Sequence, residues 1–226
     1  MKARCKALVD AIALVLVLPA VILYHIGGGV FGREKALVGW SQAFSLAPGL
    51  AGVYLRRAFY RMVLRRYAPG AFASFGCVLS HPAAEIGANV YLGPFCSLGD
   101  VTLEDDVLLA SHVSVVNGQW QHRIDRSDVP VREQPGDCPR ITIGCDSWIG
   151  ERAVVMANVG KHCVIGAAAV VTKPIPDFAI AIGAPAAVVR YRHAKTEPHV
   201  SPCERTPTET PQEIPSPLTL THDACH

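Results

Sequence analysis

Aliphatic residues recur at every sixth position through the middle of the chain. Twelve positions follow this rhythm: Ile86, Leu92, Leu98, Leu103, Leu109, Val115, Ile143, Ile149, Val155, Val159, Ile165 and Val171. Glycine follows the aliphatic residue in seven of these twelve hexads. Strands repeat every two residues and helices every 3.6, so a period of six requires a corner after each short strand. The pattern predicts a parallel β-helix whose aliphatic residues point inward and whose glycines allow the backbone geometry of the turns.

The six-residue rhythm is interrupted after every third hexad. The interruptions lie between Leu98 and Leu103, between Val115 and Ile143, and between Val155 and Val159. Because three hexads close one triangular coil, we expect all three interruptions at the same corner of the prism. The longest, residues 117–142, then leaves the prism as an excursion loop, and a loop of this length inside a compact domain is usually functional. The prism also has open ends and flat faces, which favour a homo-oligomer with sites between subunits.

The segment before the prism is apolar and basic. Two uncharged runs cover residues 11–24 and 36–55, and residues 1–70 hold ten Lys and Arg against two acidic residues. Basic flanks favour the cytoplasmic side of a membrane, so the pattern predicts that residues 7–55 form a hairpin or re-entrant anchor in the cytoplasmic leaflet. A helical subdomain that only caps the prism is the alternative. A nucleic-acid partner is not expected, because no basic groove with interleaved aromatic residues is evident.

The chain is thus expected to have three parts. Residues 1–70 form the N-terminal apolar and basic helical segment, and residues 71–195 form the all-β prism with its excursion loop. Residues 196–226 contain six prolines among Thr, Ser, Glu and Gln, a composition that predicts a disordered tail.

Two stretches of the prism carry a family resemblance. The segments are ITIGCDSWIGERAVV (141–155) and VIGAAAVVTKPIPDFAIAIGAPAAVVR (164–190). Together with a histidine-bearing loop, they resemble the left-handed β-helix acetyltransferases built from hexapeptide repeats. Within that family the similarity is nearest to the maltose, galactoside and nodulation O-acetyltransferases and the polysaccharide or colanic-acid branch, over roughly residues 78–192. The resemblance implies left-handed coiling, a homotrimer, and acetyl-CoA in a groove between adjacent prisms.

The resemblance also implies a catalytic residue in the excursion loop. The matching histidine is His122, in NGQWQHRID. An imidazole has a suitable basicity to take the proton from an acceptor hydroxyl as that hydroxyl attacks the thioester. Asp125 or Glu133 could orient the ring. His112 is a rival, but the hexad count puts it on a coil, where a structural or interfacial role is expected.

Four residues match the family's contacts with acetyl-CoA: the backbone of Ala167, then Thr172, Lys173 and Arg190. Lys173 and Arg190 would meet the phosphates as charged donors. Two positions depart from the family pattern. Ala187 stands where a second arginine is common, and Cys96 stands near the place of an asparagine that contacts the acceptor, so the identity of the acceptor does not carry over.

The sequence therefore favours an acetyl-CoA-dependent O-acetyltransferase, with no metal, acting on a sugar hydroxyl of a surface polysaccharide or a lipid-linked precursor. Acetyl-CoA is cytosolic, and an enzyme held at the cytoplasmic face of the membrane would meet a membrane-held acceptor. A soluble acetyltransferase for a free sugar, serine or a xenobiotic is the second possibility. A β-helix metalloenzyme would need three histidines around zinc, and no paired histidine spacing on adjacent coils supports it. The histidine loop and VVTK argue against a non-catalytic scaffold.

Overall fold

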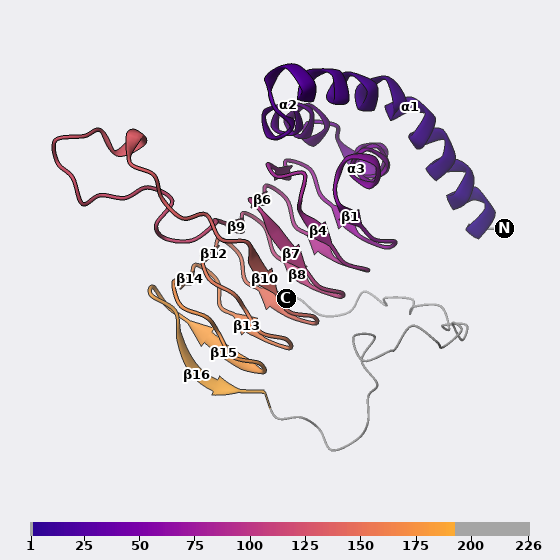
Figure 1. Ribbon diagram of the computed structural model, residues 1–226. Helices are drawn as coiled ribbons and strands as arrows, with labels where there is room; N and C mark the ends of the chain where they lie inside the picture. The colour runs from indigo at the N-terminus through magenta and orange to yellow at the C-terminus, as the bar shows by residue number, and fades with distance from the viewer. Residues whose placement is uncertain (1, 193–226) are drawn as a thin grey trace, which may run out of the picture. The chain divides into compact units, whose positions relative to one another are not determined.

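Three helices precede a winding stack of short strands (Figure 1). The computed structural model describes residues 2–192, with side chains from Leu8 onward. The helices are α1 (Lys2–Phe31), α2 (Arg33–Ser45) and α3 (Gly49–Val63). The predicted parallel β-helix with an N-terminal helical segment is confirmed, whereas the predicted disordered tail, residues 196–226, lies outside the described residues.

Three sheets form the faces of the prism. Sheet A contains β1 (Arg66–Tyr67), β4 (Glu85–Ile86), β7 (Val101–Leu103) and β10 (Ile141–Ile143). Sheet B contains β2 (Phe72–Ala73), β5 (Tyr91–Leu92), β8 (Leu108–Leu109), β11 (Trp148–Ile149), β13 (Val164–Ile165), β15 (Ala179–Ile182) and β16 (Ala187–Tyr191). Sheet C contains β3 (Val78–Leu79), β6 (Ser97–Leu98), β9 (Ser114–Val115), β12 (Val154–Val155) and β14 (Val170–Val171). All pairings are parallel except that of β16 with β15.

Successive strands fall on sheets A, B and C in turn, so three strands make one coil. The predicted interruptions all lie where the chain passes from sheet C to sheet A, which confirms that they share one corner. At the third of them Val159 replaces a full strand and bridges to Ile143 of β10. The structure also adds a coil before the first predicted hexad, because the chain enters the prism at Arg66.

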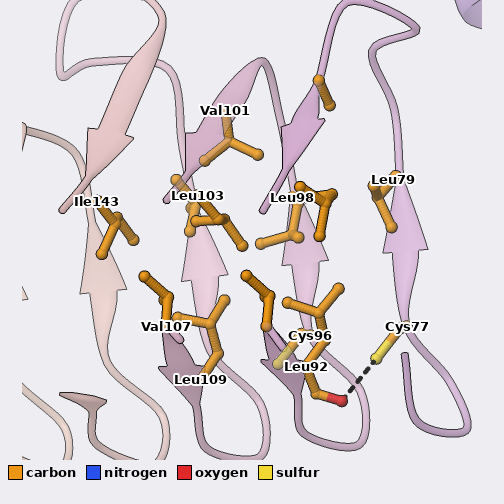
Figure 2. Close-up of a cluster of buried hydrophobic side chains, with 14 of the residues drawn as sticks. Cys77, Leu79, Leu92, Cys96, Leu98, Val101, Leu103, Val107, Leu109 and Ile143 are labelled. Atoms are coloured by element: carbon orange, nitrogen blue, oxygen red, sulfur yellow. Dashed lines mark hydrogen bonds between the residues drawn. The ribbon is translucent and has the colours of Figure 1, made fainter. Parts of the chain in front are cut away.

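Aliphatic side chains fill the interior of the prism. In the two-residue strands the second residue is buried and the first faces outward, as predicted. Figure 2 shows Leu92, Leu103 and Leu109 pointing into this core, with the thiol of Cys77 directed at the carbonyl of Leu92. The thiol of Cys77 donates to the carbonyl of Gly93 at 2.9 Å. Burial of each large aliphatic side chain stabilises the fold by about 1.5–3 kcal/mol.

The glycine after each aliphatic residue has a different role from the predicted one. The residue with positive φ is the third after the aliphatic residue, and it is not glycine: examples are Asn89 (φ 56°) and Asp106 (φ 60°). A Cβ on Gly150 would lie 2.5 Å from the backbone nitrogen of Ala167 in the next coil. Glycine is therefore required by the close approach of successive coils, not by the conformation of the turn.

The helices close the open end of the first coil, as the capping alternative anticipated. Helix α3 packs against β1 and β2, and α2 packs against β3. The backbone N–H of Leu79 donates to the hydroxyl of Ser41 at 2.9 Å. The N–H of Gly76 donates to the carbonyl of Ser45, also at 2.9 Å. These contacts satisfy backbone donors that the edge of a sheet would otherwise leave without a partner.

A buried arginine holds the helices and the prism together. The side chain of Arg56 is fully buried, and this burial lowers the pKa of its guanidinium. Its Nε donates to the carbonyl of Ala73 in β2 at 3.0 Å. Its Nη1 donates to the carbonyls of Phe44 (2.9 Å) and Ala47 (2.7 Å) at the end of α2. A Cβ on Gly52 would lie 1.9 Å from the Ala47 carbonyl oxygen, so this glycine makes room for the cluster.

The Arg56→Leu substitution should lower the free energy of unfolding by about 3 kcal/mol, because it removes the donor to the carbonyls of Ala73 and Ala47. Arg61→Leu is the matched control, since Arg61 is exposed on the same helix, and it should change the free energy by less than about 0.5 kcal/mol. Urea unfolding followed by circular dichroism measures both. Equal stabilities of the two variants would contradict the role assigned to Arg56.

Candidate functional site

The excursion loop leaves the prism between β9 and β10 and extends away from it (Figure 1). Its root depends on Asn117, which is only 3% exposed. The Asn117 side-chain oxygen accepts from the backbone N–H of Asp100 at 2.8 Å, and its amide donates to the carbonyls of Asp100 (2.7 Å) and Pro139 (2.9 Å). A Cβ on Gly99 would lie 1.9 Å from the Asn117 oxygen. Both ends of the loop are thus fixed to one corner.

A second buried amide organises the outer part of the loop. The side chain of Gln134 donates to the carbonyls of Arg126 (2.7 Å) and Val129 (2.9 Å), and it accepts from the Arg126 N–H at 3.3 Å. An antiparallel bridge between His122 and Pro135 pairs the two limbs. A single 3-10 turn, η1 (Val131–Glu133), lies between Val129 and Gln134. The loop therefore has a defined conformation in which His122 occupies a paired backbone position.

An exposed ion pair lies at the far side of the loop. The Nε of Arg126 donates to a carboxylate oxygen of Asp128 at 3.1 Å. The Arg126 guanidinium keeps the pKa of the Asp128 carboxyl below its ordinary value. Because both groups are fully solvated, the pair restrains the loop only weakly.

The imidazole of His122 is exposed and makes no hydrogen bond or ion pair with the described part of its own chain. Asp125 is also exposed, and the structure records no bond from its side chain within residues 2–192. The carboxylate of Glu133 pairs with Arg132 at 3.5 Å. A single chain therefore does not bring either acid into a hydrogen bond with the histidine.

One hydrogen bond connects the loop with the segment expected to bind acetyl-CoA. The side-chain amide of Gln119 donates to the backbone carbonyl of Thr172. Thr172 and Lys173 follow β14, at the same corner from which the loop emerges. The structure therefore brings the root of the His122 loop next to VVTK. The sequence did not indicate Gln119, because no periodic pattern runs through the loop.

The other two expected cofactor residues lie elsewhere on the prism. Ala167, an exposed residue, is in the corner between sheets B and C, and its backbone N–H donates to no acceptor in the described residues. Arg190 is exposed in β16, paired with Ile180. Neither Arg190 nor Lys173 forms an ion pair with any described side chain. These two cations are thus available to a ligand, but on different sides of the chain.

The outer face of sheet B is apolar. Its outward residues stand in one register row: Phe72, Tyr91, Leu108, Trp148, Val164 and Ile180. Tyr91, Leu108 and Trp148 are 39%, 46% and 52% exposed in the single chain. The equivalent row on sheet A is polar, with Glu85 paired to Arg65 and Arg140 at 3.2 Å each. In a triangular prism, sheet B lies opposite the corner that carries the excursion loop.

The remaining histidines of the coils have structural surroundings. His112 takes φ of 58° in a turn and stacks on Phe95, with ring centroids 5.0 Å apart. His162 stacks on Phe178 at 4.9 Å, and its Nδ1 lies 2.9 Å from a carboxylate oxygen of Asp146. Among residues 2–192, no group of three or more histidine, cysteine, aspartate and glutamate side chains is arranged to hold a metal ion.

The geometry defines a parallel β-helix of hexapeptide repeats with one long excursion loop, and the relatives that the chain matches are acetyltransferases. A probable acetyltransferase of Mycobacterium tuberculosis is 37% identical over 100 residues, which are 43% of this chain and 33% of that protein. Galactoside O-acetyltransferase of Escherichia coli K12 is 34% identical over 128 residues, 54% of this chain and 58% of that protein. The chain thus spans between one third and about three fifths of these relatives. No protein-family model matches the chain.

Solved structures agree with these relatives. A galactoside acetyltransferase in complex with coenzyme A superimposes with a TM-score of 0.59 and 27% identity, covering 70% of this chain and 78% of that one. A maltose O-acetyltransferase of Clostridium difficile 630 has the same fold, with a TM-score of 0.63 and 19% identity over 71% of this chain and 89% of that one. The resemblance to hexapeptide-repeat acetyltransferases is confirmed.

The Asn117→Ala substitution should loosen the excursion loop without unfolding the prism, because only the root of the loop loses its hydrogen bonds. Proteolytic cleavage within residues 116–140 should become about tenfold faster, whereas the melting temperature of the prism should hardly change. Ser127→Ala, an exposed position in the same loop, is the control. Limited proteolysis with mass spectrometry measures the rates, and equal cleavage of both variants would be the contrary result.

Proposed function

We propose that this protein is an acetyl-CoA-dependent O-acetyltransferase that modifies a sugar hydroxyl of a surface polysaccharide or of its lipid-linked precursor. The observation that carries the proposal is the meeting of two segments at one prism corner. The loop with His122 is tied through Gln119 to Thr172 of VVTK. The related galactoside O-acetyltransferase supports the reaction class, and a putative lipopolysaccharide biosynthesis O-acetyltransferase of Escherichia coli, 30% identical over 105 residues, supports a glycan acceptor.

In the proposed reaction His122 is the general base. Its imidazole takes the proton of the acceptor hydroxyl while the oxygen attacks the thioester carbonyl. The C–S bond then breaks, and the imidazolium gives that proton to the departing sulfur, so coenzyme A leaves as the thiol. The acetyl group passes directly to the acceptor, so no acyl-enzyme forms. An exposed, unpaired imidazole on a loop of defined conformation suits this role, because nothing in the described chain competes for its lone pair.

The proposed cofactor contacts are the free N–H of Ala167, the segment Thr172–Lys173, and Arg190. Lys173 and Arg190 have no acidic partner among the described side chains, so either can pair with a phosphate of coenzyme A. They lie on different sides of one prism. A single coenzyme A molecule would therefore contact them from two neighbouring chains.

We infer that the active assembly is a homotrimer whose sites lie between subunits. Closed rings form through heterologous contacts, in which one surface of a chain meets a different surface of the next. The apolar row on sheet B, including Leu108 and Trp148, is an exposed apolar surface of the prism itself that a neighbouring chain could cover. The loop corner lies opposite sheet B in each prism, so a ring would bring the His122 loop of one chain toward Trp148 of its neighbour.

A soluble acetyltransferase for a small acceptor is the second candidate. The galactoside O-acetyltransferase relative favours it, since that protein's acceptor is a galactoside by name. Helix α1 favours the first candidate, because within residues 2–192 it is the one helix long and apolar enough to cross a bilayer. On that ground we place the enzyme at the cytoplasmic face of the membrane, where acetyl-CoA is available. Thioester cleavage with lipid extracts and with free sugars distinguishes the two acceptors.

His122→Ala should lower kcat by about 10²- to 10⁴-fold, since it removes the base and leaves cofactor binding intact. Lys173→Ala should instead raise the KM for acetyl-CoA with little change in kcat, because its charge meets the bound phosphates in both ground and transition states. His112→Ala is the control and should keep both constants near those of the native chain. Thioester cleavage at varied acetyl-CoA measures all three, and near-native kcat in His122→Ala would overturn the catalytic assignment.

Leu108→Glu should convert the trimer into monomers, because it places a charge in the centre of the apolar row on sheet B. Thr102→Glu is the matched control, since Thr102 faces outward from the polar sheet A in the same coil. Light scattering after size exclusion gives the number of chains per particle. A native Leu108→Glu trimer would place the interface on another face.

A further inference from the structure

Helix α1 carries an unusually large apolar surface on the side that faces away from the protein. The exposed large residues of this face are Leu8, Val9, Ile12, Val15, Leu16, Leu18, Ile22, Leu23, Ile26, Val30 and Phe31. Several are more than half exposed, among them Val15 (65%) and Ile26 (60%). A helix that is apolar on every side belongs in a protein core or in a membrane, and a contiguous apolar surface of this size marks an interaction site.

The opposite side of α1 is fixed along the helical cap. Val17 and Tyr24 are at most 1% exposed, and the ring of Tyr24 meets Phe59 of α3 edge to face, with centroids 6.2 Å apart. Near the other end, Asp10 pairs with Arg57 of α3 at 3.8 Å. In Figure 1, α1 lies across α2 and α3 on the side away from the strands. The inner face of α1 is therefore part of the folded domain.

This packing is incompatible with a helix that crosses the bilayer. A spanning α1 would draw α3, which carries three arginines, into the hydrocarbon region, where charged side chains are costly. Arg56 also bonds the first coil of the prism, so the coil would have to follow. The length of α1, about 45 Å, can instead lie along the surface.

Basic residues adjoin the C-terminal end of the apolar face. Arg33 and Lys35 are exposed immediately after α1 ends, with Glu34 between them, and Arg61 is exposed on α3, which packs against α1. The only acidic residue in the apolar stretch of α1 is Asp10, which is already paired. An apolar helix face next to exposed basic residues is complementary to an anionic lipid surface.

We propose that α1 is an in-plane membrane anchor. Its outer face is inserted among the acyl chains of an anionic leaflet, while its inner face stays on α2 and α3. This arrangement differs from the hairpin or re-entrant anchor that the sequence predicted for residues 7–55, because α1 is one continuous helix and the segments after it cover the prism. The inference rests on the membrane attachment proposed above, but it does not depend on acetyl transfer.

The two ends of α1 provide the first test. The full-length chain carries one epitope tag at its N-terminus and another at its C-terminus, and inside-out membrane vesicles are treated with protease. An in-plane helix leaves both tags on the cytoplasmic side, so both should be digested. Protection of the N-terminal tag, with loss of the C-terminal one, would show that α1 crosses the bilayer and would overturn the proposal.

The outer face provides the second test. The double variant Val15→Glu/Ile22→Glu should reduce flotation with vesicles containing anionic phosphatidylglycerol by about tenfold or more. The control Ile124→Glu/Val131→Glu also changes two exposed aliphatic residues, in the excursion loop, and should float like the native chain. Both α1 substitutions are at exposed positions, so the melting temperature of lipid-free protein should be unchanged. Native flotation of Val15→Glu/Ile22→Glu would refute the insertion of this face.

A parallel activity measurement separates this inference from the proposed function. Thioester cleavage with a soluble acceptor should be the same in Val15→Glu/Ile22→Glu and in the native chain, because neither residue touches the candidate site. If the native chain does not float, the anchor and the membrane attachment both fail, whatever the activity. If it floats but cleaves no thioester, the anchor stands and the proposed reaction fails.

Discussion

Backbone hydrogen bonding between successive coils is the constraint on which the rest of the structure depends. Each coil offers its N–H and C=O groups to the next, as in the bond from the Tyr91 N–H to the Val107 carbonyl at 2.9 Å. The resulting spacing, about 4.8 Å, leaves no room for a Cβ on residues such as Gly150. At the two ends the ladder must stop. At the first coil, Ser41 and Arg56 of the helices form hydrogen bonds with the backbone groups of the terminal strands. At the last coil, the antiparallel strand β16 pairs with β15.

The same constraint decides where the chain can carry function. A residue inserted within a strand would shift the register of its whole sheet and turn buried side chains outward. An insertion at a corner disturbs no ladder. The extra residues that interrupt the six-residue repeat lie at the corner between sheets C and A, from the short passage before Val101 to the whole excursion loop. Asn117 and Gln119 then restrain this long segment at its root. A stiff prism thus supports one adaptable site at a place that its own hydrogen bonds leave free.

Much of the fold could be predicted from the sequence, because inward residues repeat with the period of the coil. The six-residue aliphatic pattern predicted the positions of the strands and the single corner at which the interruptions lie. It did not give the first coil, where Tyr67 and Ala73 replace the aliphatic residues of later coils. The reason for the recurring glycine was also missed, since the contact between Gly150 and Ala167 is visible only when coils are stacked.

The candidate site was less accessible to sequence reasoning than the fold. Loop residues have no period, so neither Gln134 nor the bond from Gln119 to Thr172 could be foreseen. The apolar row on sheet B could have been found in the regular coils, because its members there stand one position before an inward aliphatic residue, as Leu108 stands before Leu109. The relation of His122 to Asp125 and Glu133 could not be predicted, because the exposed loop leaves their side chains apart in one chain.

The layered arrangement at the N-terminal end has a consequence for the size of the acceptor. With α1 at the lipid surface, the layer of α2 and α3 and then the first coils of the prism separate the bilayer from the root of the excursion loop. Helix layers of about 10 Å and coils of about 4.8 Å give a standoff on the order of 25 Å. If the acceptor is the lipid-linked saccharide proposed above, a sugar attached directly to its lipid would lie too low to be modified. The height of the site above the bilayer would then select sugar rings that lie several units away from the lipid along a growing glycan.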